Sequence, residues 1–172
     1  MKLTTDVLLK GDVWTTTLDK MVGKIFPYQY DIYVLSISIG ISNDRIVETL
    51  VQSEETPTRS IPRTMLYKNA DVLSYLFETA ILCTSCVDIS EKERLEIAFN
   101  DENDMKFNKI DLLTKFANAG IEEIGKCISE VDEETITNIS KLCQDLLTDD
   151  IQRIIKKLDK PLEEDTDNID II

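Results

Sequence analysis

The sequence predicts an all-α protein, a single-domain irregular bundle of about five to seven helices in residues 1–158, followed by an acidic tail in residues 159–172. Only five glycines and four prolines occur in 172 residues, and unbranched polar residues that favour helices are abundant. Hydrophobic residues make up 42% of the chain, an ordinary share for a globular domain. A chain of this length usually forms one domain.

The first helix is expected at residues 12–26. Asp12 is a plausible N-cap, and Pro27 should end the helix. One apolar stripe contains Trp14, Leu18, Met21, Val22 and Ile25.

Residues 30–42 are ambiguous between strand and helix. Every second residue is large and apolar: Tyr33, Leu35, Ile37, Ile39 and Ile41. This alternation is typical of a strand, and the period alone slightly favours one. The same run also fits a buried helix. Ser36 and Gly40 would then share one helix face and let another backbone approach closely.

The middle of the chain alternates loops and helices. Residues 51–66 read as a polar loop, and residues 70–84 as a helix with Asn69 as a possible cap. Its predicted inward-facing residues are Val72, Leu73, Leu76, Phe77, Ala80 and Ile81. Ser90 and Glu93 have capping-box spacing, which predicts a short helix to about Phe99 before a surface loop.

Two longer helices complete the predicted bundle. The first covers residues 108–128, and the second should be capped by Asp132, with a possible kink at residues 148–150. The stripe of the second contains Ile136, Ile139, Cys143, Leu146, Leu147, Ile151, Ile154, Ile155 and Leu158. The acidic tail then reads as disordered by composition.

The net charge of −14 is divided unevenly along the chain. Residues 1–86 hold eight basic and ten acidic residues, whereas residues 87–172 hold eleven basic and twenty-three acidic ones. The C-terminal half, at −12, should repel phosphate, so we expect no direct nucleic-acid contact. A basic protein partner suits this charge, although a solvated acidic surface is the simpler interpretation.

The absence of histidine narrows the possible chemistry. Serine–histidine and cysteine–histidine catalysis within this chain are excluded. No glycine-rich phosphate loop occurs, and we expect no cofactor. The acidic loop from Asp101 to Asp104 lacks the glycine and glutamate of an EF-hand. Glu91, Glu93 and Glu96, with Asp104 and Lys106, leave a carboxylate-bound metal as a remote alternative.

Cys83 and Cys86 form a C-x-x-C motif at the end of a predicted helix. Zinc would require two further ligands, and a redox pair should open a helix rather than close one. Core packing is the preferred interpretation. The chain start, MKLTTDVLLKGDVW, has no long apolar core, and no apolar run approaches the roughly 20 residues of a membrane span. We therefore expect a cytoplasmic protein with reduced thiols and no membrane contact.

Candidate partner-binding residues lie in two places. Four basic residues surround the proline-containing loop and could contact phosphate or an acidic partner: Arg45, Arg59, Arg63 and Lys68. A mixed-charge surface loop is the simpler interpretation, since acidic residues lie nearby. The tail ends in Ile169, Ile171 and Ile172, which could dock on a partner.

Two stretches carry a family resemblance. Val34–Arg45 is an apolar run with Gly40 before a basic loop, and Phe116–Ile124 contains Ala-Asn-Ala-Gly-Ile. Their order resembles the small helical proteins associated with bacterial DNA-phosphorothioation (Dnd) defence operons, over residues 30–128. Ala119 stands where that pattern has a glycine. The resemblance implies that residues 30–42 are helical and that the chain is an accessory subunit of an anti-phage system.

Three functions follow as hypotheses. The leading one is a non-catalytic accessory subunit that docks on a larger nuclease or ATPase partner, with homo-oligomerisation left open. The alternative is an acidic DNA mimic that inhibits a nucleic-acid-binding protein. The second alternative is an enzyme with a carboxylate-bound metal.

Overall fold

The computed structural model describes residues 5–99 and 108–158, which form seven helices and one small sheet and confirm the all-α class. The last residues of α7, from 153 onward, are described by their backbone only. The elements are β1 (Val7–Leu9), α1 (Asp12–Met21), α2 (Gln29–Ser42), β2 (Arg59–Ile61), α3 (Arg63–Lys68), α4 (Ala70–Cys83), α5 (Glu91–Phe99), α6 (Lys109–Lys126) and α7 (Asp132–Leu158).

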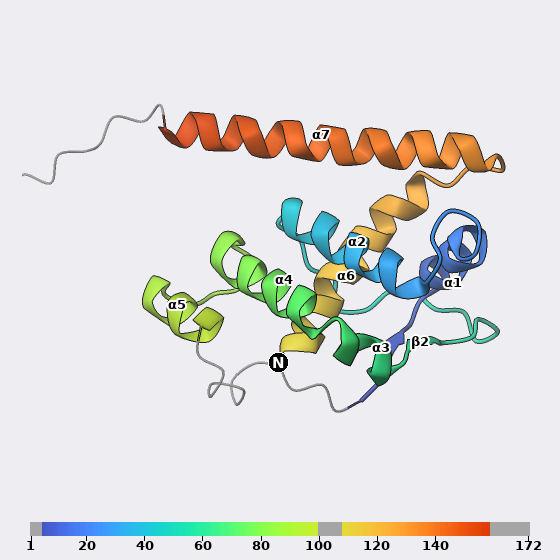
Figure 1. The fold of residues 1–172 in the computed structure, drawn as a ribbon, viewed down its shortest axis with the longest axis horizontal. Coiled ribbons are helices and arrows are strands. Elements are labelled where there is room, and N and C mark those ends of the chain that lie inside the picture. Colours follow the sequence, from blue (N-terminus) through green and yellow to red (C-terminus); the bar gives the residue numbers. More distant parts are fainter. Residues whose placement is uncertain (1–4, 100–107, 159–172) are drawn as a thin grey trace, which may run out of the picture.

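The centre of the fold is the crossing of α2 and α6 (Figure 1). A Cβ atom on Gly40 would lie 2.1 Å from the carbonyl oxygen of Phe116, and one on Gly120 would lie 1.9 Å from that of Ser36. Only glycine permits such an approach of two backbones. The helical alternative for residues 30–42 is therefore confirmed, as is the close approach predicted at Ser36 and Gly40.

The first helix is shorter than predicted. It ends at Met21 rather than at Phe26, because Gly23 adopts a φ of +77°, which a right-handed helix does not accommodate. The amides of Ile25 and Phe26 both donate to the carbonyl of Met21, so these residues form a compact turn.

The small sheet corrects the prediction that residues 51–66 are only a loop. β1 and β2 pair antiparallel, with Val7 opposite Ile61 and Leu9 opposite Arg59. Val7, Leu9 and Ile61 are buried, so this pairing closes one end of the core. Residues 63–66, also assigned to the loop, form the start of α3.

The α4–α5 connection follows the predicted capping box. The Ser90 hydroxyl accepts a hydrogen bond from the Glu93 amide, and the Glu93 carboxylate accepts one from the Ser90 amide. The Arg94 guanidinium donates to the carbonyls of Ile81 and Thr84 at 2.7 Å and to that of Val87 at 2.9 Å. These bonds tie the end of α4 to the start of α5.

The long helix α7 spans 27 residues and runs straight across the bundle in Figure 1, without the kink considered at residues 148–150. Ile139 is buried, and Leu142, Cys143 and Leu146 pack against the core. Within residues 5–99 and 108–158, no helix combines the length and apolarity needed to cross a membrane.

Candidate functional site

A cleft of about 840 Å³ lies where the C-terminal ends of α2 and α4 approach α7. Its lining includes Ile41 and Ser42 of α2, Thr79 and Leu82 of α4, and Asp150 of α7. Sites for small ligands and for inserted side chains have volumes of this order, about 300–1,000 Å³. The cleft is the principal candidate for a binding site.

Thr79 and Leu82 of α4 line the cleft, and they belong to a partly apolar face of the helix that the fold leaves exposed. Val72, Tyr75, Thr79 and Leu82 are spaced three, four and three residues apart, so they share one side of the helix. Val72 is 44% exposed, Tyr75 68% and Leu82 39%. The prediction that Val72 packs inward is therefore wrong, because the core-facing side of α4 is occupied by Leu73, Leu76, Phe77, Ala80 and Ile81.

Helix α7 also exposes apolar side chains. Leu147 is 63% exposed and Ile151 is 57% exposed, and both lie within one turn of Asp150, although Asp150 is the α7 residue that lines the cleft.

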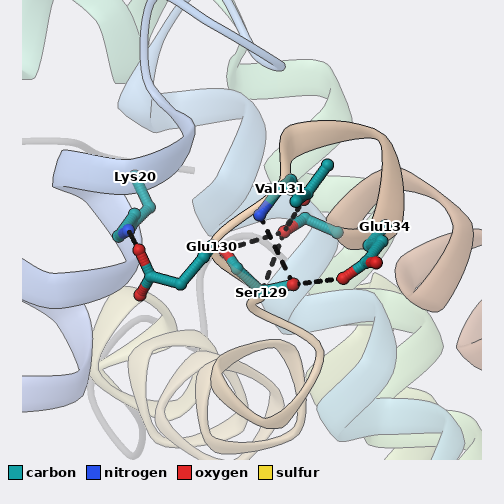
Figure 2. A network of polar contacts seen from close by, with 6 residues as sticks. Lys20, Ser129, Glu130, Val131 and Glu134 are labelled. Atoms are coloured by element: carbon teal, nitrogen blue, oxygen red, sulfur yellow. Dashed lines mark hydrogen bonds and ion pairs between the residues drawn. The ribbon is translucent and has the colours of Figure 1, made fainter.

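A polar turn between α6 and α7 sets the direction in which α7 leaves the bundle. Figure 2 shows Ser129 at the centre of this turn. Its amide donates to the Thr135 hydroxyl at 2.9 Å, and its hydroxyl donates to the Glu134 carboxylate at 2.5 Å. The Glu130 carboxylate forms an ion pair with the Lys20 ammonium of α1, at 3.2 Å. The turn thus anchors the start of α7 to the bundle.

The three helices that meet at the cleft carry a net negative charge. Over the whole of α2, α4 and α7, nine acidic and four basic residues give a net charge of −5. The acidic residues are Asp31, Asp71, Glu78, Asp132, Glu133, Glu134, Asp145, Asp149 and Asp150, and the basic residues are Lys141, Arg153, Lys156 and Lys157. Arg94 also lines the cleft, but its guanidinium is bound to the three carbonyls at the end of α4.

The rim of the cleft contains a cluster formed by Asp44, Ser85 and Cys86. Asp44 has a φ of +48°, and its carboxylate accepts hydrogen bonds from the amide and hydroxyl of Ser85 and from the Cys86 thiol. Partial burial raises the pKa of Asp44, but these hydrogen bonds outweigh it and leave the pKa below its ordinary value. Burial, together with the hydrogen bond to Asp44 and its charge, raises the pKa of Cys86 to about 11.

The C-x-x-C motif therefore lacks the usual electrostatics of a redox pair. A reactive cysteine needs a lowered pKa, whereas the Cys86 thiol is held protonated beside a carboxylate. Cys83 is exposed, and all four cysteines are free. In the described part of the chain, no three Cys, Asp or Glu side chains are grouped so as to hold a metal ion.

The carboxylates considered for a metal enzyme are only partly described. Glu93 belongs to the capping box of α5, and Glu91 begins the same helix. Asp101, Asp104 and Lys106 lie outside the described residues.

The predicted basic residues are distributed over different elements. Arg45 pairs with Glu122 and with Glu123 of α6, and Arg59 of β2 pairs with Asp19 of α1. Arg63 and Lys68 lie exposed at the two ends of α3. Ile169, Ile171 and Ile172 lie outside the described residues. Their roles in partner binding remain predictions.

A second cleft of about 850 Å³ lies between α1 and α6, with Arg45 in its lining. Its charged groups largely neutralise one another, since Arg45 and Lys126 both pair with Glu123. The charged residues that line the two clefts sum to the same value, −1: Asp12, Glu122 and Glu123 with Arg45 and Lys126 here, and Asp44 and Asp150 with Arg94 in the α2–α4–α7 cleft.

The exposed face of α4 was the functional feature that the sequence prediction missed. A signal was present, because Tyr75 and Leu82 lie outside the predicted core stripe. The position of Leu82 in a cleft with Asp150 of α7 depends on contacts between residues far apart in the sequence.

Comparisons with known proteins add no relative. The chain matches no protein-family model, no curated protein and no solved structure.

Proposed function

We propose that this chain is a non-catalytic protein-interaction subunit of a bacterial defence complex, and that it docks on a larger nuclease or ATPase. The observation that carries the proposal is the cleft between α2, α4 and α7, together with the exposed apolar side chains on the same side of α4 as its lining residue Leu82. An apolar patch with a polar rim is typical of a protein-binding surface. The defence setting rests on the Dnd resemblance of residues 34–45 and 116–124.

The polar groups of the cleft favour binding over chemistry. The Asp44 carboxylate is bound by Ser85 and Cys86, and the Arg94 guanidinium is bound by backbone carbonyls. A general acid or base must be able to exchange a proton with a substrate. These groups instead stabilise the connection between α4 and α5.

The two glycine-containing stretches have a structural explanation of their own. Gly40 and Gly120 form the α2–α6 crossing, and Asn118 accepts a buried hydrogen bond from Trp14. If this chain and the Dnd-associated proteins share these glycines, the shared residues would preserve the helix crossing that supports the cleft.

Co-expression with the products of neighbouring genes tests this function. We expect one of them to co-purify with the 19.6 kDa chain as a stoichiometric complex in size-exclusion chromatography with light scattering. Elution of the chain alone in every combination would contradict the proposal.

A DNA mimic is the second candidate, favoured by the net charge of −12 over residues 87–172. Mimicry would require carboxylates of this segment to replace DNA phosphates on a nucleic-acid-binding protein. Changing Asp132, Glu133, Asp145 and Asp149 to their amides should then abolish inhibition of DNA binding. Unchanged inhibition by this variant would exclude mimicry.

A further inference from the structure

We infer that α7 pairs antiparallel with the α7 of a second copy of this chain, so that the protein forms a dimer with two-fold symmetry. The inference goes beyond the proposed function and does not depend on the docking of a nuclease or ATPase. It is carried by an exposed apolar seam along α7 and by the opposite charges at the two ends of that helix.

The α7 seam consists of three exposed apolar side chains, Ile136, Leu147 and Ile151, which are 46%, 63% and 57% exposed. The first two are eleven residues apart and the last two are four apart, so all three lie on one side of the helix, within about 60°. The sequence continues this spacing with Ile154 and Leu158. Apolar residues separated alternately by four and three positions are typical of the seam between two paired helices.

The α7 seam lies beside the side of the helix that packs against the bundle. Ile139 is buried, and Cys143 and Leu146 pack against the core. Leu147 follows Leu146 directly, about 100° further around the helix. In Figure 1, α7 lies along one edge of the bundle, and no other element of the described residues lies beyond it. A second helix therefore has access to α7 without displacing its contacts to the bundle.

The two ends of α7 carry opposite charges. The acidic residues at its start are Asp132, Glu133 and Glu134, and the basic residues at its end are Arg153, Lys156 and Lys157. Two copies bring these opposite charges together at both ends only when their α7 helices run antiparallel. A parallel pair would place like charges against each other at each end. Charge complementarity thus selects a second copy of α7 in the antiparallel direction.

The acidic residues in the middle of α7 do not oppose this pairing. Asp145 and Asp149 each lie two residues from Leu147, or about 160° around the helix, so they are on the opposite side from the seam. Asp150 lines the α2–α4–α7 cleft. With six acidic and four basic residues, α7 holds a net charge of only −2 out of the −14 of the chain. Most of the negative charge therefore lies outside the paired helices.

Light scattering of the full-length protein over a range of concentrations tests the dimer. We expect the molecular mass to rise from 19.6 kDa towards twice that value between about 1 µM and about 200 µM protein. Leu147→Glu should raise the dissociation constant of the dimer about tenfold or more, because it places a charge in the seam. The matched control is Leu95→Glu, at an exposed leucine of α5, which should change that constant less than about twofold. A chain that stays monomeric throughout this range, or equal weakening by the two variants, would overturn the inference.

Charge reversal tests the antiparallel direction. Asp132→Lys with Glu133→Lys makes both ends of α7 basic, and Lys156→Glu with Lys157→Glu makes both ends acidic. Each double variant alone should dimerise about tenfold or more weakly than the unmodified chain. An equimolar mixture of the two should form a heterodimer within about twofold of the original affinity, because opposite charges then meet again at both ends.

The mixture also separates pairing from a stabilisation within one helix. An acidic start and a basic end stabilise an isolated helix through its dipole, and that effect alone predicts two less stable variants that do not restore each other. In the unmodified protein, carbodiimide cross-linking of isotopically labelled with unlabelled chains should join Lys156 or Lys157 of one copy to Asp132 or Glu133 of the other. Failure of the mixed variants to dimerise would overturn the inference. So would dimerisation that either charge reversal leaves unchanged or strengthens, as expected for a parallel pair.

Discussion

At the scale of single residues, Asn118 connects three separate parts of the fold. Its carbonyl oxygen accepts a hydrogen bond from the Trp14 indole at 3.0 Å, and its amide donates to the Val47 carbonyl at 3.1 Å. Trp14 is fully buried. Asn118 therefore satisfies a core indole and fixes the segment after α2 at the same time.

Replacement of Asn118 by alanine should lower the free energy of unfolding by about 3 kcal/mol, since a buried group left unpaired costs roughly 1–3 kcal/mol. Urea unfolding followed by the fluorescence of Trp14, the single tryptophan, measures this loss. Asn138→Ala removes an exposed hydrogen bond to Cys127 and should cost less than about 1 kcal/mol. Equal losses of unfolding free energy in the two variants would contradict the prediction, because the buried Trp14–Asn118 hydrogen bond would then contribute no more to stability than an exposed one.

The reactivity of Cys86 should be low and strongly dependent on pH. With a pKa of about 11, its thiolate fraction at pH 8 is about one in a thousand, so alkylation should accelerate about tenfold per pH unit up to pH 10. Peptide mass spectrometry after iodoacetamide treatment follows the site. Asp44→Asn removes the negative charge beside the thiol and should accelerate labelling at pH 8. Glu48→Gln is a control away from Cys86, and a labelling rate that levels off below pH 9 would contradict the prediction.

At the scale of elements, the α2–α6 crossing is the contact least tolerant of change. Gly120→Ala would place a methyl group against the Ser36 backbone, so the two helices would have to separate. We expect a loss of about 3 kcal/mol or more, because a backbone cannot rotate away as a side chain can. The methyl group of Gly125→Ala in the same helix would meet side chains and no backbone, Val13 at 2.8 Å and Thr17 at 3.8 Å. Its cost should stay below about 1 kcal/mol, since alanine also improves helix propensity.

The urea concentrations at the unfolding midpoints of Gly120→Ala and Gly125→Ala, compared with that of the unmodified protein, test this prediction. Similar midpoints would mean that the crossing relaxes easily and that Gly120 is not required for close packing. Circular dichroism before unfolding shows whether Gly120→Ala still folds, and complete loss of helix would be the extreme form of the expected result.

The period of the apolar residues predicted helices that bury a single face, such as α6. It was ambiguous for α2, which is buried on more than one face. The helix α6 has a clear apolar stripe and lies at Lys109–Lys126, close to the predicted 108–128. Helix α2 buries Ile32 and Tyr33 and also Ile39 and Gly40, so no polar face reveals its period. Its alternating pattern slightly favoured a strand, and only the family resemblance indicated the helix.

The features that the sequence did not predict depend on contacts between residues that are far apart in the sequence. Strands β1 and β2 contain three residues each and pair across about fifty residues of chain, too short for a local pattern to be distinctive. The cleft likewise requires α4 and α7, which are far apart in sequence, to lie on either side of the end of α2. The acidic character of residues 87–172 was predictable, whereas the exposed apolar face of α4, in the less acidic half of the chain, was not.

At the scale of the whole molecule, charge repulsion opposes the compact state. The net charge is −14, and the ion pairs Lys20–Glu130, Arg45–Glu122, Arg59–Asp19 and Lys115–Glu48 each involve at least one substantially exposed side chain. Exposed pairs such as Lys115–Glu48 contribute about 0–1 kcal/mol each. Repulsion among the unpaired carboxylates of an acidic surface is reduced by salt.

Raising NaCl from about 0.02 M to 0.3 M should therefore stabilise the protein by about 1 kcal/mol, because screening weakens the repulsion more than it weakens the few surface ion pairs. The urea midpoint of the full-length chain at the two salt concentrations measures the effect. Asp145→Asn with Asp149→Asn removes two exposed carboxylates of α7, so this variant should start from a higher midpoint in low salt and gain less on salt addition. The matched control is Glu54→Gln with Glu55→Gln, two exposed carboxylates in the less acidic half of the chain, which should reduce the salt response by a smaller amount. A midpoint that falls as salt is added would mean that the ion pairs outweigh the repulsion, and the acidic surface would then have to be stabilised by contacts within the chain.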